Sequence, residues 1–296
     1  MTDPARRRVC VLGASGWIGR ELMRQSSQAG DVIGTSRSPL RGLATVSSMG
    51  DLGGLLRERK VGTVINCVGA TNGDESEQRV ANVDHARDVA ELCLRLGVRL
   101  LHVGSAAEYG DAGDRLVGED TETQPRSLYG RTKLAGTNEL LRAAERGLDV
   151  IVARPFNVLG PSQPLNTPPA DFAAAVNALP ASGGTVEVRD SSLVRDFMSL
   201  ERLAMSLLGL AAAPSASGIV NVCSGRGVSF GELVHAMAAA RGVRITIVDT
   251  APGGVPRVVG DPTRLNALIG RAEPESTVEM ARAALSQESR LHSSIE

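Results

Sequence analysis

The order of apolar segments constrains this chain more than any other feature of its sequence. Five apolar runs of strand length occur in the first half, at residues 7–14, 31–36, 63–69, 99–105 and 149–155. They are continuous rather than alternating, which is typical of strands buried on both faces of a parallel sheet. Helical patterns separate them, at roughly 17–28, 76–96 and 127–146. This repeated alternation predicts a doubly wound α/β domain.

The second half of the chain has a different texture. A loop-like stretch rich in Pro and Asn begins at residue 156, and irregularly spaced helices are expected near 170–179, 199–212, 229–241 and 275–287. The apolar run at 218–224 predicts a strand that returns to the sheet. We therefore divide the chain into a sheet domain and a smaller C-terminal lobe that caps the carboxyl edge of the sheet. The sheet domain comprises residues 1–155 plus about 195–224, and the lobe comprises residues 156–194 plus 225–296.

Composition and charge argue against several classes of protein. The net charge is −1, so no basic surface for nucleic acid is expected. The four cysteines form no CxxC pair and the four histidines are scattered, so we expect free thiols and no metal site. No run reaches the roughly 18 apolar residues of a membrane helix, and the start lacks a secretion signal. These features predict a cytoplasmic protein without a membrane segment.

Glycines mark the turn after the first predicted strand. This turn has the sequence GASGWIG, which holds Gly13, Gly16 and Gly19. Glycine permits a tight turn, lets a pyrophosphate approach backbone N–H groups, and lets the next helix pack closely on the strand. The pattern predicts a dinucleotide site in a Rossmann-type sheet domain. We also assign three neighbours in the loop, Ser15, Trp17 and Ile18, to the cofactor-binding residues. Trp17 is interpreted mainly as a packing residue.

The end of the second predicted strand indicates which dinucleotide binds. An acid at this place binds the ribose 2′-hydroxyl of NAD, whereas an arginine accommodates the 2′-phosphate of NADP. The chain has no acid here and offers Ser36 and Arg37. A charge-assisted hydrogen bond contributes roughly 1.5–3 kcal/mol, which is enough to set a preference. We favour NADP(H), with NAD(H) as the alternative; Arg37 as an ordinary solvated cation is the competing interpretation.

Two rare residues occur together in the segment YGRTK. The chain has only two tyrosines and two lysines, yet Tyr129 lies four residues before Lys133. Residues at this spacing share one face of a helix, so both side chains project together. A neighbouring ammonium favours the phenolate, so we expect the pKa of Tyr129 to be lowered towards the neutral range. Tyr129 would then exchange a proton with a carbonyl or carbinol oxygen. A surface pair without function is the alternative.

Taken together, the glycine loop, YGRTK and the segment HVGSAAEYG resemble the extended short-chain dehydrogenase/reductase family, also called the NAD-dependent epimerase/dehydratase family. The similarity runs nearly end to end. It implies that Ser105 hydrogen-bonds the reacting oxygen, that Tyr129 is the acid or base, and that Lys133 tunes the tyrosine and binds the ribose. It also implies a homodimer formed through the helices at 82–96 and 127–146.

Other segments extend the resemblance to the binding residues. Asp51 and Leu52 match the segment that contacts adenine, and NCVGA at 66–70 matches the strand end that lines the nicotinamide pocket. The implied cofactor-binding residues therefore also include Cys67, Val68, Gly69, Tyr129, Lys133 and Pro155. The implied substrate-binding residues, which would face a nucleotide diphosphate, are Ser105, Ala106, Asn157, Arg195 and Arg257. For the last three, capping or turn formation is the alternative role.

Departures from the family pattern narrow the implied reaction. Dehydratases of the family carry an Asp–Glu pair after the active-site Ser or Thr, where this chain has Ala106 and Ala107. The segments SAAEYG, RDF (195–197) and GDPTRL (260–265) most resemble reductases of nucleotide-linked 4-keto-6-deoxy sugars. The resemblance thus implies NADPH-dependent reduction of such a sugar. The alternatives are a 4-epimerase that retains NAD and a catalytically silent NADP-sensing protein. Relatives usually have Arg at the position of Ala251, so a substrate that is not a nucleotide sugar is a further alternative.

Overall fold

The computed structural model describes residues 8–26, 31–165 and 167–286. Three predicted elements extend beyond these residues: the strand at 7–14 by residue 7, the helix at 17–28 by residues 27–28, and the helix at 275–287 by residue 287. Those positions lie outside the described residues. Among the described residues, no helix is both long and apolar enough to cross a membrane. The same residues contain no group of three or more His, Cys, Asp or Glu side chains arranged to hold a metal ion.

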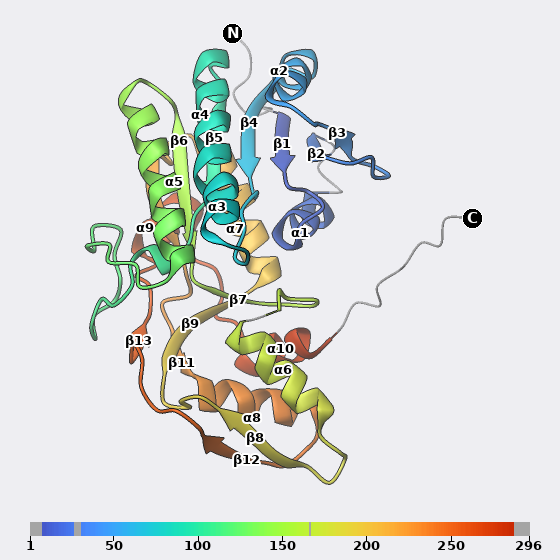
Figure 1. Ribbon diagram of the computed structural model, residues 1–296, viewed down its shortest axis with the longest axis vertical. Helices are drawn as coiled ribbons and strands as arrows, with labels where there is room; N and C mark the ends of the chain where they lie inside the picture. Colours follow the sequence, from blue (N-terminus) through green and yellow to red (C-terminus); the bar gives the residue numbers. More distant parts are fainter. Residues whose placement is uncertain (1–7, 27–30, 166, 287–296) are drawn as a thin grey trace.

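A seven-stranded parallel sheet organises the first part of the chain (Figure 1). Six strands match the predicted apolar runs, and the short edge strand β3 joins them. The bounds are β1 Arg8–Leu12, β2 Val32–Ser36, β3 Ala44–Thr45, β4 Val61–Asn66, β5 Arg99–Val103, β6 Val150–Pro155 and β10 Gly218–Val222. The spatial order is β10-β6-β5-β4-β1-β2-β3, with every neighbouring pair parallel. The predicted doubly wound fold is confirmed, and its strand order reverses between β1 and β4.

Helices cover both faces of this sheet, which explains why its strands are apolar throughout. In β6, Val150 and Val152 pack on one side, while Ile151 and Ala153 pack on the other. The first side is covered by α2 Met49–Glu58, α4 His85–Leu96 and α5 Leu128–Glu145. The second side is covered by α1 Trp17–Ser26, α7 Leu200–Ala212 and α9 Thr263–Ile269. Because successive residues of a strand point to opposite faces, a strand buried between two helical layers shows no alternation.

The helix predicted at 76–96 is interrupted. It consists of α3 Glu75–Arg79, a π-helical turn at Val80–Asp84, and α4. The wider turn places the buried side chain of Asn82 against α5 and the segment after β4. There its amide nitrogen donates to the hydroxyl of Thr132 at 3.0 Å and to the carbonyl oxygen of Ala70 at 2.8 Å. π-turns often occur near functional sites.

The C-terminal lobe lies below the carboxyl edge of the sheet, towards which the strands of Figure 1 point. Its four-stranded sheet contains β7 Asn157–Leu159, β9 Val194–Ser199, β11 Gly227–Ser229 and β13 Arg257–Val258. A parallel pair, β8 Gly184–Val188 and β12 Ile245–Asp249, packs near α6 Pro168–Ala178, α8 Phe230–Arg241 and α10 Thr277–Leu285. Within the segment 195–224, β10 belongs to the main sheet and α7 packs on it, whereas β9, which ends at Ser199, pairs within the lobe.

Candidate active site

A cavity of about 590 Å³ opens at the carboxyl ends of the central strands. Its walls come from both the sheet domain and the lobe. The predicted site residues that line it are Trp17, Ile18, Cys67, Gly69, Ser105, Ala106, Tyr129, Lys133, Pro155, Asn157 and Arg195. The structure therefore brings all three predicted catalytic residues together with three further predicted substrate residues, Ala106, Asn157 and Arg195. Ligands of open α/β sheets bind at this edge, near the point where the strand order reverses.

The glycine turn has the geometry of a phosphate cradle. Gly13 has a φ of +75°, a conformation that side-chain-bearing residues rarely adopt. A Cβ atom on Gly19 would lie 2.1 Å from the carbonyl oxygen of Gly13, so the helix can approach the strand only because this residue is glycine. Ser15 and Gly16 are exposed at the tip, and α1 has no acid in its first turn. A pyrophosphate fits this helix N-terminus.

Trp17 connects this turn to the lobe side of the cavity. Its indole N–H donates to the carbonyl oxygen of Pro161 at 2.7 Å. A Cβ atom on Gly160 would lie 3.4 Å from the Trp17 ring. The indole thus packs between the glycine turn and the loop after β7.

The two residues predicted to select NADP differ in their surroundings. Ser36 is buried, and its hydroxyl donates to the carbonyl oxygen of Ser38. Arg37 is exposed at the end of β2 and makes no hydrogen bond or ion pair within the described part of the chain. Burial lowers the pKa of His85, and the nearby Arg37 charge lowers it further. Arg37 is thus free to meet an anion, whereas the Ser36 hydroxyl already has a partner.

Asp51 and Leu52, matched by resemblance to an adenine-contacting segment, both have local roles. The Asp51 carboxylate accepts hydrogen bonds from the hydroxyl of Ser47 and the backbone N–H of Ser48, which caps α2 and lowers the pKa of Asp51. Leu52 is buried in the core beneath α4. Neither residue lines the cavity, and their contact with adenine stays a prediction.

Lys133 lies buried at the inner end of the cavity. Its Nζ atom donates to the carbonyl oxygen of Val103 at 2.7 Å. Burial lowers the pKa of Lys133 to about 8, although the charge of Glu108 opposes this change. A Cβ atom on Gly69 would lie 3.0 Å from the Lys133 Nζ atom, so glycine keeps the approach to the ammonium open. Burial also raises the pKa of the adjacent Cys67 thiol to about 12.

Tyr129 and Ser105 meet although they belong to different segments. Tyr129 lies in the first turn of α5, which Ser127 caps by accepting the N–H of Gly130. Ser105 follows β5, and its hydroxyl lies close enough to the Tyr129 phenol to lower the pKa of that group. The predicted lowering of the Tyr129 pKa is wrong in this structure. Burial raises that pKa, the nearby Ser105 hydroxyl lowers it only in part, and the Glu108 charge adds to the rise.

A buried ion pair that was not predicted from the sequence lies behind these residues. Glu108 and Arg154 are almost completely buried, and the Arg154 Nη2 atom lies 2.8 Å from the Glu108 Oε2 atom. Glu108 also accepts the backbone N–H of Ser105 and the hydroxyl of Thr137. The sequence did contain a signal for this pair. Arg154 lies within an apolar strand and Glu108 lies shortly after another, and charged residues in such places are rarely buried unless they are paired.

The substrate side of the cavity contains a second unpredicted residue. Gln163 is 9% exposed, and neither atom of its amide group has a hydrogen-bond partner among the described residues. Asn157 donates to the carbonyl oxygen of Asp196, and the Arg195 guanidinium lies over the ring of Phe230, 5.5 Å from its centroid. Arg257 lies in β13 and does not line the cavity.

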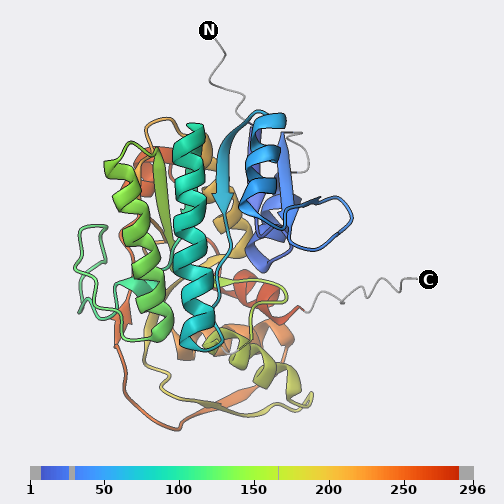
Figure 2. The same ribbon diagram turned by 45° about the horizontal axis from the view of Figure 1, so that its top comes forward.

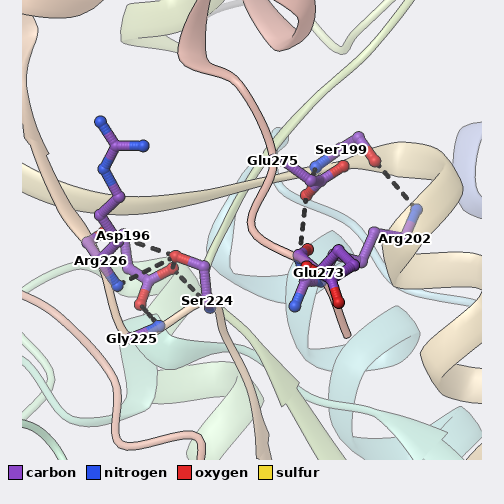
Figure 3. A network of polar contacts seen from close by, with 8 residues as sticks. All are labelled: Asp196, Ser199, Arg202, Ser224, Gly225, Arg226, Glu273 and Glu275. Carbon is purple, nitrogen blue, oxygen red and sulfur yellow. Dashed lines mark hydrogen bonds and ion pairs between the residues drawn. The ribbon is translucent and has the colours of Figure 1, made fainter. Parts of the chain in front are cut away.

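A separate cavity of about 380 Å³ lies between the lobe and the helices α7 and α9, and none of the predicted site residues lines it. Figure 3 shows the polar contacts beside it. Asp196 is buried and accepts hydrogen bonds from the hydroxyl and N–H of Ser224 and from the N–H of Gly225. Nearby, Arg202 donates to the carbonyl oxygen of Glu273. Asp196 thus anchors the loop between β10 and β11.

The chain belongs to the NAD dependent epimerase/dehydratase family, whose sequence profile it matches over residues 9–223. It is therefore an NAD(P)-dependent enzyme of the extended short-chain dehydrogenase/reductase type, as the sequence predicted.

Several relatives are similar over most of their length. The chain is 34% identical over 277 residues to the dTDP-6-deoxy-L-talose 4-dehydrogenase (NAD(P)(+)) of Kitasatospora kifunensis, with 86% of each chain covered. It is 28% identical to the GDP-6-deoxy-D-mannose reductase of Pseudomonas aeruginosa, over 94% of this chain and 96% of that one.

Solved structures of similar fold cover most of this chain. The structure of RMD from Pseudomonas aeruginosa complexed with NADPH has a TM-score of 0.80 and 25% identity, covering 94% of this chain and 96% of that one. The Thermus thermophilus UDP-glucose 4-epimerase in complex with NAD has a TM-score of 0.79 at 23% identity, covering 94% and 97%, which supports the fold alone.

Proposed function

We propose that this enzyme catalyses the NADPH-dependent reduction of a keto group on a nucleotide-linked 4-keto-6-deoxy sugar. The observation that carries the proposal is the convergence of Ser105, Tyr129 and Lys133 on one cavity at the point where the strand order reverses. Two similar proteins are named for the oxidation or reduction of nucleotide-linked deoxysugars, which supports this substrate class.

The chain offers a complete set of residues for the cofactor. The N-terminus of α1, with Gly13 and Gly16, would hold the pyrophosphate, and Lys133 would hold the nicotinamide ribose. Arg37, which has no ion-pair partner among the described residues, would bind the 2′-phosphate and so favour NADP(H) over NAD(H). When bound, this cofactor supplies the hydride that reduces the carbonyl carbon.

Tyr129 would provide the proton. Its raised pKa keeps it a neutral phenol, which suits a group that donates to the oxygen developing as the carbonyl becomes an alcohol. Ser105 would hydrogen-bond the same oxygen and orient it towards the phenol. The carbonyl thus gains one hydride and one proton, and Tyr129 recovers its proton from solvent. Ala106 and Ala107 also line the cavity and provide no carboxylate for eliminating water.

The substrate would lie between these residues and the lobe. Gln163, Asn157 and Arg195 line that part of the cavity. Burying an amide without partners costs roughly 1–3 kcal/mol, so a hydrogen bond from the sugar or diphosphate to Gln163 would recover that loss.

The test uses purified protein with GDP- and dTDP-linked 4-keto-6-deoxyhexoses. We expect loss of NADPH absorbance, with one cofactor consumed per sugar reduced, and no net change with an unreduced nucleotide hexose. Bound NAD together with interconversion of two hexose epimers without added cofactor would show an epimerase instead. Binding of NADPH without turnover of any sugar would favour the sensing role.

The homodimer implied by the family resemblance is also a proposal. α4 and α5 lie side by side on the outer surface of the sheet domain, where a second copy would find two parallel helix faces (Figure 2). Sedimentation at micromolar concentration should give the mass of two chains. A monomeric mass would contradict this arrangement.

A further inference from the structure

We propose that Glu108 is a positioning residue: its buried carboxylate fixes the Ser105 turn to the helix that carries Tyr129 and Lys133, and it places a negative charge beside that helix. This inference rests on the proposed roles of those three residues. Its main test requires no sugar substrate, so it can fail independently of the proposed function.

The two carboxylate oxygens of Glu108 hold different segments. Oε1 accepts the backbone N–H of Ser105 at 2.9 Å, which fixes the turn that presents the serine hydroxyl. Oε2 accepts the hydroxyl of Thr137 at 2.8 Å. Thr137 lies one turn after Lys133 on α5, and it is fully buried. A single side chain therefore connects the end of β5 with the catalytic helix.

Arg154 on β6 completes the anchor. Its Nε and Nη2 atoms both lie within 2.9 Å of the Glu108 Oε2 atom. Its guanidinium lies 4.5 Å from the centroid of the Tyr109 ring, and the Tyr109 hydroxyl donates to Asn221 on β10 at 2.7 Å. The carboxylate therefore has partners from three segments, namely the turn after β5, α5 and β6, while Tyr109 connects the network to β10.

The backbone leaves space for this carboxylate. A Cβ atom on Gly104 would lie 2.7 Å from the Glu108 Oε1 atom, so any larger residue at position 104 would displace it. Gly104 directly precedes Ser105, and its N–H donates to the carbonyl oxygen of Ala153. The segment GSAAE therefore contains both Ser105 and the carboxylate that fixes the backbone of its turn.

The Glu108 charge acts on the catalytic residues as well as on the backbone. It raises the pKa values of both Lys133 and Tyr129, which favours the ammonium and the neutral phenol. Several titratable or charged groups surround Glu108: Arg154 on β6, Lys133 and Tyr129 on α5, and the adjacent Tyr109. Glu119 acts on Tyr109, Cys67 acts on Lys133, and Lys133 acts on His102. Of these groups, Glu108 is the carboxylate that acts on Lys133, so removing its charge should lower the pKa of Lys133.

The experiment follows the ionisation of Lys133 by NMR of protein labelled with [ε-¹³C]lysine. The chain has only two lysines, and the Lys60→Arg variant assigns the signals. Lys133 should titrate near 8, and Glu108→Gln should lower that midpoint by at least about one pH unit, a tenfold change in the ionisation constant. Glu145→Gln, an exposed carboxylate at the end of α5, is the matched control and should leave the midpoint unchanged.

The direction of the shift separates the electrostatic role from a structural one. Opening of the site would expose Lys133 to water and raise its midpoint towards the ordinary value of about 10.4. A midpoint that rises or stays constant in Glu108→Gln would therefore overturn the proposal. Should that variant fail to fold, Glu108→Gln combined with Arg154→Met removes both charges, and a smaller lowering is expected, because loss of the Arg154 cation by itself raises the pKa of Lys133.

A second measurement tests the geometric link. Thr137→Val removes one hydrogen bond to Glu108 and keeps the side-chain shape, whereas Thr137→Ser keeps the hydroxyl. With the keto-sugar substrate, we expect kcat to fall roughly tenfold in Thr137→Val, with the KM for NADPH unchanged, and to recover in Thr137→Ser. Equal kcat values in the two variants would contradict the positioning role.

Discussion

Gly19 and Gly54 offer a direct test of whether the glycine turn is shaped for a cofactor. Both glycines lie inside helices, in α1 and α2 respectively. A Cβ atom on Gly19 would lie 2.1 Å from the carbonyl oxygen of Gly13 and 2.7 Å from the Cα atom of Ala14. A Cβ atom on Gly54 would meet nothing within 4 Å. The same substitution to alanine therefore has opposite expected effects at the two positions.

The magnitudes follow from these contacts. Alanine favours a helix over glycine by about 1 kcal/mol, so Gly54→Ala should stabilise the protein by up to that amount. In Gly19→Ala the obstructing atoms belong to the backbone and cannot rotate away, so α1 must move from the turn. Overpacking of this kind costs roughly 1–3 kcal/mol, which leaves a net destabilisation of up to about 2 kcal/mol. Displacing the helix N-terminus should also weaken NADPH binding at least about tenfold, the value of one lost charge-assisted hydrogen bond.

Urea unfolding and NADPH titration measure both effects. The single tryptophan, Trp17, lies in the turn itself, so its fluorescence reports on binding at the site of the substitution. We expect Gly54→Ala to bind NADPH as the unmodified protein does. If Gly19→Ala matched Gly54→Ala in both stability and affinity, the close approach of helix and strand would have no role in binding.

Four further predictions address individual residues. Because Arg37 is the unpaired cation at the end of β2, NADPH should bind at least about tenfold more tightly than NADH, and Arg37→Asp should reverse that order; equal affinities in the unmodified protein would refute the preference. Tyr129→Phe should keep NADPH affinity and lower turnover by roughly 10²-fold, as expected for a lost general acid, so substantial remaining activity would exclude the proposed mechanism. Gln163→Ala should raise the KM for the sugar with little change in kcat, because neither amide atom has a partner in the described part of the chain; an unchanged KM would place the substrate elsewhere. Since the pKa of Lys133 is lowered to about 8, its charge is present below that pH and lost above it, so NADPH affinity should fall above pH 8 in the unmodified protein and show no such fall in Lys133→Met.

The features that the sequence determined by itself are local. Continuous apolar runs predicted six strands of the main sheet, because burial on both faces leaves no polar face along a strand. The glycine spacing predicted the turn before α1, where Gly13 requires a positive φ. The four-residue spacing placed Tyr129 and Lys133 on one face of α5, since the helical repeat sets that relation within one segment.

Other features depended on contacts between distant segments. Ser105 lies near Tyr129 only because the turn after β5 packs against α5, and Glu108 in that turn meets Thr137 of α5 and Arg154 of β6. The direction of the Tyr129 pKa shift was wrong from sequence, because spacing reveals a neighbouring cation but not the depth of burial. The cap role of Asp51 and the unpartnered amide of Gln163 likewise emerged only with the fold. Burial and long-range contacts depend on how all segments pack at once, whereas spacing within one helix or turn is set by the backbone alone.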